Sequence, residues 1–422
     1  MTKLFHTLVF MICGLALSAQ TMPEPQRTLR VDYQFTGDAN TREIALSELC
    51  SFEGWAGRRV HTDSVPLKGN GDITLRDART GRVIYCQSFS TLFQEWVTTD
   101  EARHVRRAFE NCFLLPMPAD SARITVRLFG MDQQVEAEYT HTVDPHDILI
   151  RRLDGMPVPP HRYLHRSGEP ADKIDVAIVA EGYTAAQADD FSEAAQAAVD
   201  AILAHEPFGR LADRFNFVAV AAPSRDADVS IPLEGLWRHT ALGSHFSTFY
   251  SDRYLTTLRM RDLHNLLAGI PYEHIIILAN TGTYGGGGIY NAYTLTTTHH
   301  AKFRPVVVHE FGHSFAGLGD EYAYNDSYGD FYFSHIEPWE QNLTTLHRFA
   351  DKWQDMLPEG TPVPTSPEGR GADQVGVYEG AGYMPKGVYR PSPDCRMRTN
   401  ECKGFCPVCQ RAIERLVRFY TR

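Results

Sequence analysis

Two histidines and a carboxylate stand close together in the segment VVVHEFGHSFAGLGDEY, residues 306–322. His309 and His313 are four residues apart, so on a helix both project from one face at a spacing that suits a single zinc ion. Glu310 is rotated off that face, where its carboxylate can reach a water bound to the metal. The surrounding Val and Phe residues would bury the helix, and buried imidazoles without a partner are costly. The pattern therefore predicts a helical zinc site.

The residues after the second histidine predict a turn that brings a third ligand to the site. Gly317 and Gly319 disfavour a helix interior and favour left-handed turns, so the helix is expected to end there. A catalytic zinc usually has three protein ligands and one water. Asp320 is favoured as the third ligand because it comes first out of the turn, whereas Glu321 can instead hold a ligating histidine. The alternative is that His309 and His313 are ordinary core residues, but it does not explain the glycines and carboxylates that follow them.

A run of four glycines precedes the helix in TGTYGGGGIYNAYTLTT. Such a run is not expected to support a packed strand, so its backbone either turns with positive φ or allows close approach. It lacks the ending of a phosphate loop and the spacing of a dinucleotide fingerprint, which excludes nucleotide binding. A plain flexible loop is an equal alternative. If the loop lies beside the site, Gly285, Gly286 and Gly287 can bind an extended peptide as an added strand.

These residues need a scaffold, and the sequence predicts two kinds. KIDVAIVAEGY, FNFVAVAA and EHIIILAN are continuous apolar strands, and TAAQADDFSEAAQAAVDAILAH is a helix opened by Thr184, a good N-cap. Strands alternating with helices indicate an α/β domain. Between about residues 28 and 150, short alternating strands such as TLRVDYQFTGD predict a β-sandwich whose polar residues form a solvated face. No clustered chemistry is evident in that half.

The predicted organisation is a multidomain α+β chain. Its parts are a signal peptide at 1–19, an N-terminal β-sandwich at 24–155, a linker at 156–172 and an α/β catalytic domain at 173–422. The linker is assigned because MPVPPHRYLHRSGEPAD is rich in proline and polar residues.

The first residues predict export. An apolar run from Leu8 to Leu17, followed by Ser18 and Ala19, reads as a secretory signal peptide cleaved near Ala19. The run is shorter than the roughly 18 to 20 apolar residues that span a bilayer, and we expect no transmembrane segment after cleavage. The expected destination is the periplasm, the cell surface or the medium. A net charge of −11 argues against a nucleic-acid binder.

Four cysteines crowd the C-terminal stretch CRMRTNECKGFCPVC: Cys395, Cys402, Cys406 and Cys409. In an oxidising compartment a disulfide staple is favoured over a structural zinc site or a redox pair. The sequence leaves the pairing open.

Four stretches together carry a resemblance to a known family: HEFGHSFAGLGDEY, YGGGG, IVAEGYT and YRPSPDCRMRTNECKGFCPVC. They resemble the bacterial immunoglobulin-A metallopeptidases, secreted zinc peptidases with an N-terminal β-domain. The resemblance implies a metzincin-like zinc domain in which His309 and His313 bind Zn²⁺, Glu310 is the catalytic base and Asp320 is the third ligand. It also implies that Met397 takes the place of the methionine turn beneath the metal.

One departure concerns the third ligand. The long zinc-binding helices of related peptidases carry a glycine and a third histidine where this chain has Ala316 and Gly319.

The expected function is hydrolysis of protein or peptide substrates, with host immunoglobulin or another glycoprotein among the candidates. Zinc lowers the pKa of its bound water and polarises the scissile carbonyl, while Glu310 accepts the proton of the water and passes it to the leaving amine. An alternative is an exported binding or adhesion module with a vestigial zinc domain. Glu310 argues against it, because a site relieved of catalysis does not need that carboxylate.

Overall fold

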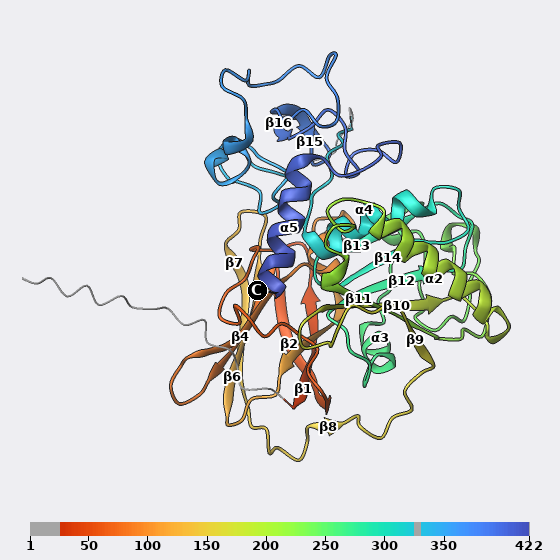
Figure 1. Ribbon diagram of the computed structural model, residues 1–422. Coiled ribbons are helices and arrows are strands. Elements are labelled where there is room, and N and C mark those ends of the chain that lie inside the picture. The colour runs from red at the N-terminus through yellow and green to blue at the C-terminus, as the bar shows by residue number, and fades with distance from the viewer. Residues whose placement is uncertain (1–25, 325–330, 422) are drawn as a thin grey trace, which may run out of the picture.

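The computed structural model in Figure 1 describes residues 26–324 and 331–421. The predicted signal peptide at 1–19 lies outside the described residues. The strands are β1 (Arg27–Gly37), β2 (Arg42–Glu53), β3 (Gly71–Asp77), β4 (Val83–Phe89), β5 (Arg107–Pro116), β6 (Ala122–Phe129), β7 (Val135–Val143), β8 (Arg151–Arg152), β9 (His161–His165), β10 (Ile174–Glu181), β11 (Phe215–Val220), β12 (His274–Ala279), β13 (Gly286–Ile289), β14 (Tyr293–Thr297), β15 (Tyr378–Ala381) and β16 (Met384–Arg390).

Helices connect these strands and cover the sheets. The α-helices are α1 (Leu92–Trp96), α2 (Ala188–Leu203), α3 (Met260–Leu266), α4 (Phe303–Ala316) and α5 (Pro407–Thr421). The 3-10 helices are η1 (Glu101–Arg103), η2 (Ala185–Gln187), η3 (Ala212–Arg214), η4 (Pro232–Glu234), η5 (Thr248–Tyr250), η6 (Phe349–Asp351) and η7 (Gln354–Met356). The molecule is thus of mixed α and β structure, with an N-terminal domain made mainly of strands.

The N-terminal domain consists of two sheets with the orders β5-β1-β2-β8 and β4-β3-β6-β7. They share one core, in which Phe35 of β1 packs on Phe89 of β4 with ring centroids 6.2 Å apart. The alternation in TLRVDYQFTGD correctly predicts which residues of β1 face this core. The other face of β1 is not solvated as expected, because Arg30 is fully buried and donates to Asn265 of α3 at 2.9 Å.

The second domain is built on a six-stranded sheet with the order β13-β14-β12-β10-β11-β9. Strands β11, β10, β12 and β14 run parallel, and β9 and β13 pair antiparallel at the two edges. Every residue of β10, β11 and β12 is buried, as expected for parallel strands covered on both faces. Part of the segment 156–172 differs from the expected linker. Residues 161–165 form β9, and Tyr163 and Leu164 pack against the core.

Two helix boundaries follow the local sequence signals. Thr184 caps the turn η2 that leads into α2, and its side chain and that of Gln187 form a capping box. Helix α4 ends at Ala316, and Gly317 adopts a left-handed conformation with φ +57°. Helix α4 contacts β13, β14 and α2, so nearly all of its apolar residues are buried.

The C-terminal helix α5 joins the two halves of the molecule. Figure 1 shows it between the N-terminal strands and the mixed sheet. The ring of Tyr420 packs on His274 of β12, with centroids 5.4 Å apart. On its other side, the guanidinium of Arg58 lies 4.7 Å from the ring centroid of Phe419. Among the described residues, no helix is long and apolar enough to cross a membrane.

Candidate metal centre

Three side chains meet where α4 ends. His309 and His313 project from the same face of α4, with their Nε2 atoms 3.0 Å apart. The left-handed turn at Gly317 reverses the chain and returns Asp320 to the two rings. Its Oδ1 atom lies 3.1 Å from Nε2 of His309 and 3.2 Å from Nε2 of His313. The structure therefore brings together the three residues that the sequence predicts as ligands.

Backbone carbonyls fix the tautomer of both imidazoles. Nδ1 of His309 lies 2.9 Å from the carbonyl oxygen of Arg396, and Nδ1 of His313 lies 2.6 Å from that of Leu318. Because a carbonyl only accepts, each Nδ1 must carry the proton. The neutral rings then point two Nε2 lone pairs at Oδ1 of Asp320, a buried oxygen without a hydrogen-bond partner. Three converging acceptors fit a bound cation.

The charges of these three side chains depend on one another. Burial alone would lower the pKa of His313, but the adjacent Asp320 carboxylate raises it to about 9. Burial would raise the pKa of Asp320, yet the two imidazoles hold it well below its usual range. The carboxylate therefore favours a positive charge on the imidazoles, as it would favour a cation among the three side chains.

Of the two carboxylates that the sequence leaves open, only Asp320 faces the imidazoles. The hydroxyl of Tyr383 donates to Oδ2 of Asp320 and so leaves Oδ1 turned toward the two rings. Glu321 points the other way, and its Oε1 accepts from Asn342 at 3.0 Å.

Met397 lies directly beneath α4. A Cβ atom added to Gly312 would sit 2.7 Å from Sδ of Met397, which shows how closely the methionine packs under the helix. The carbonyl of Met397 accepts from the backbone N–H of Glu321 at 2.8 Å. The preceding carbonyl, of Arg396, is the one that orients His309. This loop therefore supports both α4 and the segment after it, which carry the three converging side chains.

The glycine run forms a strand, which corrects the expectation that it could not. Residues 286–288 lie in β13, the edge strand that pairs antiparallel with β14. The close approach of other groups to the backbone, which the sequence also predicts, explains why these strand residues are glycines. A Cβ on Gly288 would lie 2.3 Å from the carbonyl oxygen of Glu310, and one on Gly287 would lie 2.7 Å from the ring of Tyr254. Glycine is required because both faces of the strand are occupied.

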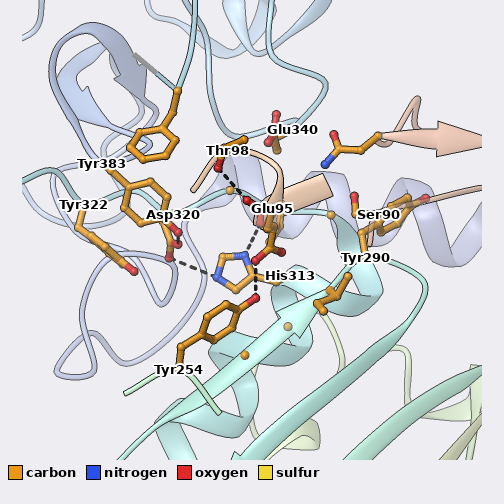
Figure 2. A pocket seen from close by; sticks show the side chains of 18 of the residues that line it. Ser90, Glu95, Thr98, Tyr254, Tyr290, His313, Asp320, Tyr322, Glu340 and Tyr383 are labelled. Atoms are coloured by element: carbon orange, nitrogen blue, oxygen red, sulfur yellow. Dashed lines mark hydrogen bonds and ion pairs between the residues drawn. The ribbon is translucent and has the colours of Figure 1, made fainter. Parts of the chain in front are cut away.

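A cleft of about 1130 Å³ runs over these groups. Its wall includes residues of the N-terminal domain, where the sequence shows no clustered chemistry. Figure 2 shows Glu95, from α1, beside His313 and Tyr254. The hydroxyl of Tyr254 donates to Glu95, and burial raises the pKa of this carboxyl to about 7 against the opposing effect of that hydrogen bond.

Comparison with models of known protein families identifies the family of this chain. The family model described as IgA Peptidase M64 matches residues 163–371 and 366–417. The chain belongs to the IgA peptidase M64 family. A second model, Peptidase M64 N-terminus, matches residues 23–140. A search of the curated proteins returned no match. The resemblance read from the sequence motifs is thereby confirmed, and membership indicates a peptidase of the metallopeptidase class.

In this M64 peptidase all of the predicted site residues line one cleft. They are His309, Glu310, His313, Asp320, Gly285, Gly286 and Gly287. Sequence reasoning missed Tyr383, Tyr254 and Glu95, because each reaches the cleft from a segment without a motif. Of the three, only Tyr383 could have been suspected from the sequence, because it lies shortly before the stretch YRPSPDCRMRTNECKGFCPVC that carries the family resemblance.

Proposed function

We propose that this M64 peptidase is an exported zinc-dependent endopeptidase with Glu310 as its general base. The observation that carries the proposal is the convergence of two Nε2 lone pairs and one carboxylate oxygen at the floor of a long cleft. Export rests on the apolar leader sequence at 1–19 alone.

His309, His313 and Asp320 would hold the ion. Two imidazoles and one carboxylate form a ligand set typical of catalytic zinc, in which a coordination position stays open for water. When bound, zinc supplies a Lewis acid that lowers the pKa of water and polarises a carbonyl.

Glu310 is placed to move a proton. It follows His309 on α4 and lines the cleft beside the edge strand, where a Cβ on Gly286 would lie 3.1 Å from its Oε1. Burial raises the pKa of Glu310, and the charges of the neighbouring imidazoles oppose that rise. A carboxyl whose pKa is closer to neutral pH is a stronger base toward water than an ordinary one, and it can still return the proton to a leaving amine.

Strand β13 offers a surface for an extended substrate. It is the last strand of its sheet, and a single bridge from Tyr254 covers its start at Gly286. A peptide that pairs with Gly287 and Gly288 would run alongside Glu310, because both glycines border the cleft. The cleft is larger than the roughly 300–1,000 Å³ of small-molecule pockets, which favours a polymeric substrate.

The proposal is tested by zinc content together with digestion of a protein such as casein, with and without a chelator. We expect the purified protein to contain zinc at the histidine site and to lose its activity on chelation. Glu310→Gln should lower kcat by at least about a hundredfold while zinc stays bound, because the side chain does not coordinate the ion.

The control for this experiment is Glu359→Gln, an exposed carboxylate far along the chain from the site. It should leave both zinc content and kcat unchanged. If zinc is stoichiometric but no protein substrate is cleaved, the exported binding module is the better description. Parental activity in Glu310→Gln would exclude this residue as the base.

A further inference from the structure

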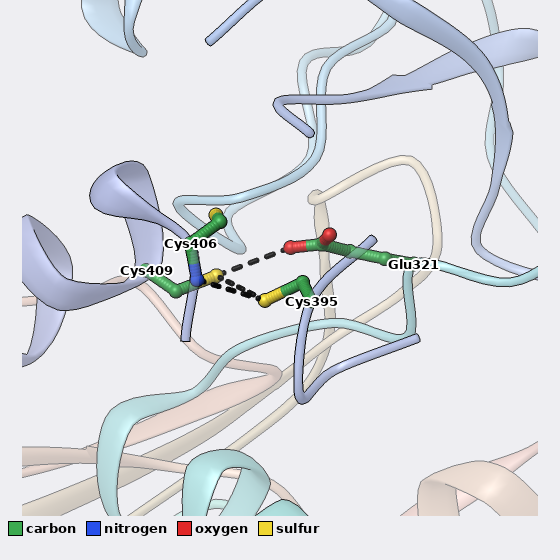
Figure 3. A group of neighbouring side chains, drawn as sticks. All are labelled: Glu321, Cys395, Cys406 and Cys409. Carbon is green, nitrogen blue, oxygen red and sulfur yellow. Dashed lines mark hydrogen bonds between the residues drawn. The ribbon is translucent and has the colours of Figure 1, made fainter. Parts of the chain in front are cut away.

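A second group of metal-binding side chains lies outside the catalytic cleft. Glu321, Cys395, Cys406 and Cys409 place one ligand atom each within 4.8 Å of one another, and all four residues are buried. Figure 3 shows the four side chains converging from three segments. The fourth cysteine of this stretch, Cys402, is half-buried and directs its Sγ to the carbonyl of Gly404 at 3.4 Å.

The spacing of the sulfur atoms fits a metal better than a disulfide. Sγ of Cys395 and Sγ of Cys409 are 3.8 Å apart. Bonded sulfurs in a disulfide are about 2.05 Å apart. Two thiolates bound at about 2.3 Å to one tetrahedral zinc are about 3.8 Å apart. The expected disulfide staple is not formed among the described cysteines, which are all free.

The carboxylate of Glu321 lacks the partners that its burial demands. Glu321 is 0% exposed, and its Oε1 lies 3.0 Å from Asn342 and 3.1 Å from Sγ of Cys409. Its Oε2 has no hydrogen-bond partner. Arg390, a buried cation of the same region, donates instead to the carbonyls of Glu379, Gly380 and Ser392. A buried carboxylate with an unpartnered oxygen is costly unless a cation is bound.

The local backbone stabilises thiolates. The N–H of Cys406 donates to Sγ of Cys395 at 3.2 Å. Helix α5 begins at Pro407, directly after Cys406, and Cys409 lies in its first turn. The positive end of the helix dipole therefore faces the sulfur atoms.

We propose that Cys395, Cys406, Cys409 and Glu321 form a second, structural zinc site. Thiolates are soft ligands that select zinc over magnesium or calcium, and four protein ligands close the coordination shell as structural sites require. Binding releases the protons of the thiols to solvent. The site does not depend on the proposed peptidase activity, because it shares no ligand with the histidine site.

The position of this second site explains what it would do. Glu321 directly follows Asp320, and Cys395 precedes the two residues whose carbonyls contact His309 and the Glu321 N–H. An ion bound here ties the third-ligand segment, the loop that holds Met397 and the start of α5 into one unit.

Zinc content of the intact protein and of matched variants tests the proposal. After dialysis against metal-free buffer, we expect two zinc ions per chain in the parent protein and in Cys402→Ser. Cys395→Ser and Cys409→Ser should each hold one ion, and so should His309→Ala, which loses the other site. Parental zinc content in both Cys395→Ser and Cys409→Ser would overturn the proposal.

Two measurements on folded parent protein keep the test independent of how the variants fold. Alkylation in denaturant without reductant, followed by peptide mapping, should find Cys395, Cys406 and Cys409 modified as thiols, whereas a disulfide at any of the three would refute the site. Replacement of zinc by Co²⁺ should give a thiolate charge-transfer band that persists in His309→Ala, because the histidine site has no sulfur. A Co²⁺-loaded protein without that band would also refute it.

Discussion

At the scale of residues, the orientation of two imidazoles decides what the site can bind. The carbonyls of Arg396 and Leu318 hold the protons on Nδ1, so that Nε2 of both rings is left as an acceptor facing Asp320. Spacing in the sequence predicts which residues converge. It does not predict which ring nitrogen faces the site, because the two carbonyls belong to segments that fold back onto α4.

Acidification should weaken zinc binding at this site. Without the ion, His313 has a pKa of about 9 because Asp320 stabilises its imidazolium against the effect of burial. That proton must leave before the ring can bind zinc. Below about pH 9, each unit of acidification should therefore raise the zinc dissociation constant by about tenfold.

The free zinc concentration that gives half-maximal peptidase activity, measured in metal buffers at several pH values, reports this constant for the histidine site alone. A half-saturation point that stays constant between about pH 6 and about pH 8 would contradict the assignment of that proton.

At the scale of elements, the edge strand β13 and α4 fit together because the strand residue that faces α4 most closely is a glycine. Gly288 faces the backbone of Glu310 and Cβ of His313, at 2.3 Å and 2.8 Å from the position of an added Cβ. Any side chain here would push the strand away from the helix that carries the candidate ligands.

Gly288→Ala should accordingly destabilise the protein by about 1–3 kcal/mol, as overpacking of a close contact does. It should also lower kcat/KM at least about tenfold, because the strand and Glu310 move apart. Gly282→Ala is the matched control, since a Cβ there meets nothing within 4 Å. Thermal unfolding of the two variants measures the effect on stability, and peptide hydrolysis kinetics measure the effect on kcat/KM. Equal effects of the two substitutions would show that the close contact is unimportant.

Local sequence patterns predicted the helices and strands better than they predicted which segments pack against one another. The N-cap at Thr184, the helix end at Gly317 and the buried strands are properties of short segments, so the sequence contains them. The strand at 286–289 was missed because its stability comes from β14 and α4, not from its own residues. The roles of Tyr383 and Glu95 were missed for the same reason: each depends on how distant segments pack.

At the scale of the whole molecule, the cleft belongs to both halves of the chain. Glu95 reaches it from the N-terminal domain and binds Tyr254 of the second half. Helix α5 packs against both halves and holds them in place.

The carboxyl of Glu95 should make the metal-free protein less stable as the pH rises. Its pKa is about 7 when folded, because burial raises it from its ordinary value of 4.5. The folded state therefore holds a proton that the unfolded chain has lost, and stability falls between about pH 4.5 and about pH 7. Glu95→Gln removes this effect, so the difference in unfolding free energy between about pH 5 and about pH 8 should shrink by roughly 1–3 kcal/mol.

Denaturant unfolding of the chelator-treated protein at the two pH values measures this difference. The exposed Glu359→Gln should behave like the parent protein. An unchanged pH dependence in Glu95→Gln would mean that this carboxyl is ionised in the folded state.

The position of Glu95 has a consequence for how cleavage specificity can differ among members of the family. One wall of the cleft belongs to the domain matched at residues 23–140, and the candidate metal centre belongs to the domain matched at residues 163–417. The sequence of either domain can therefore change while the other stays the same. A chimera that exchanges only the first region should cut different sequences with the same chemistry.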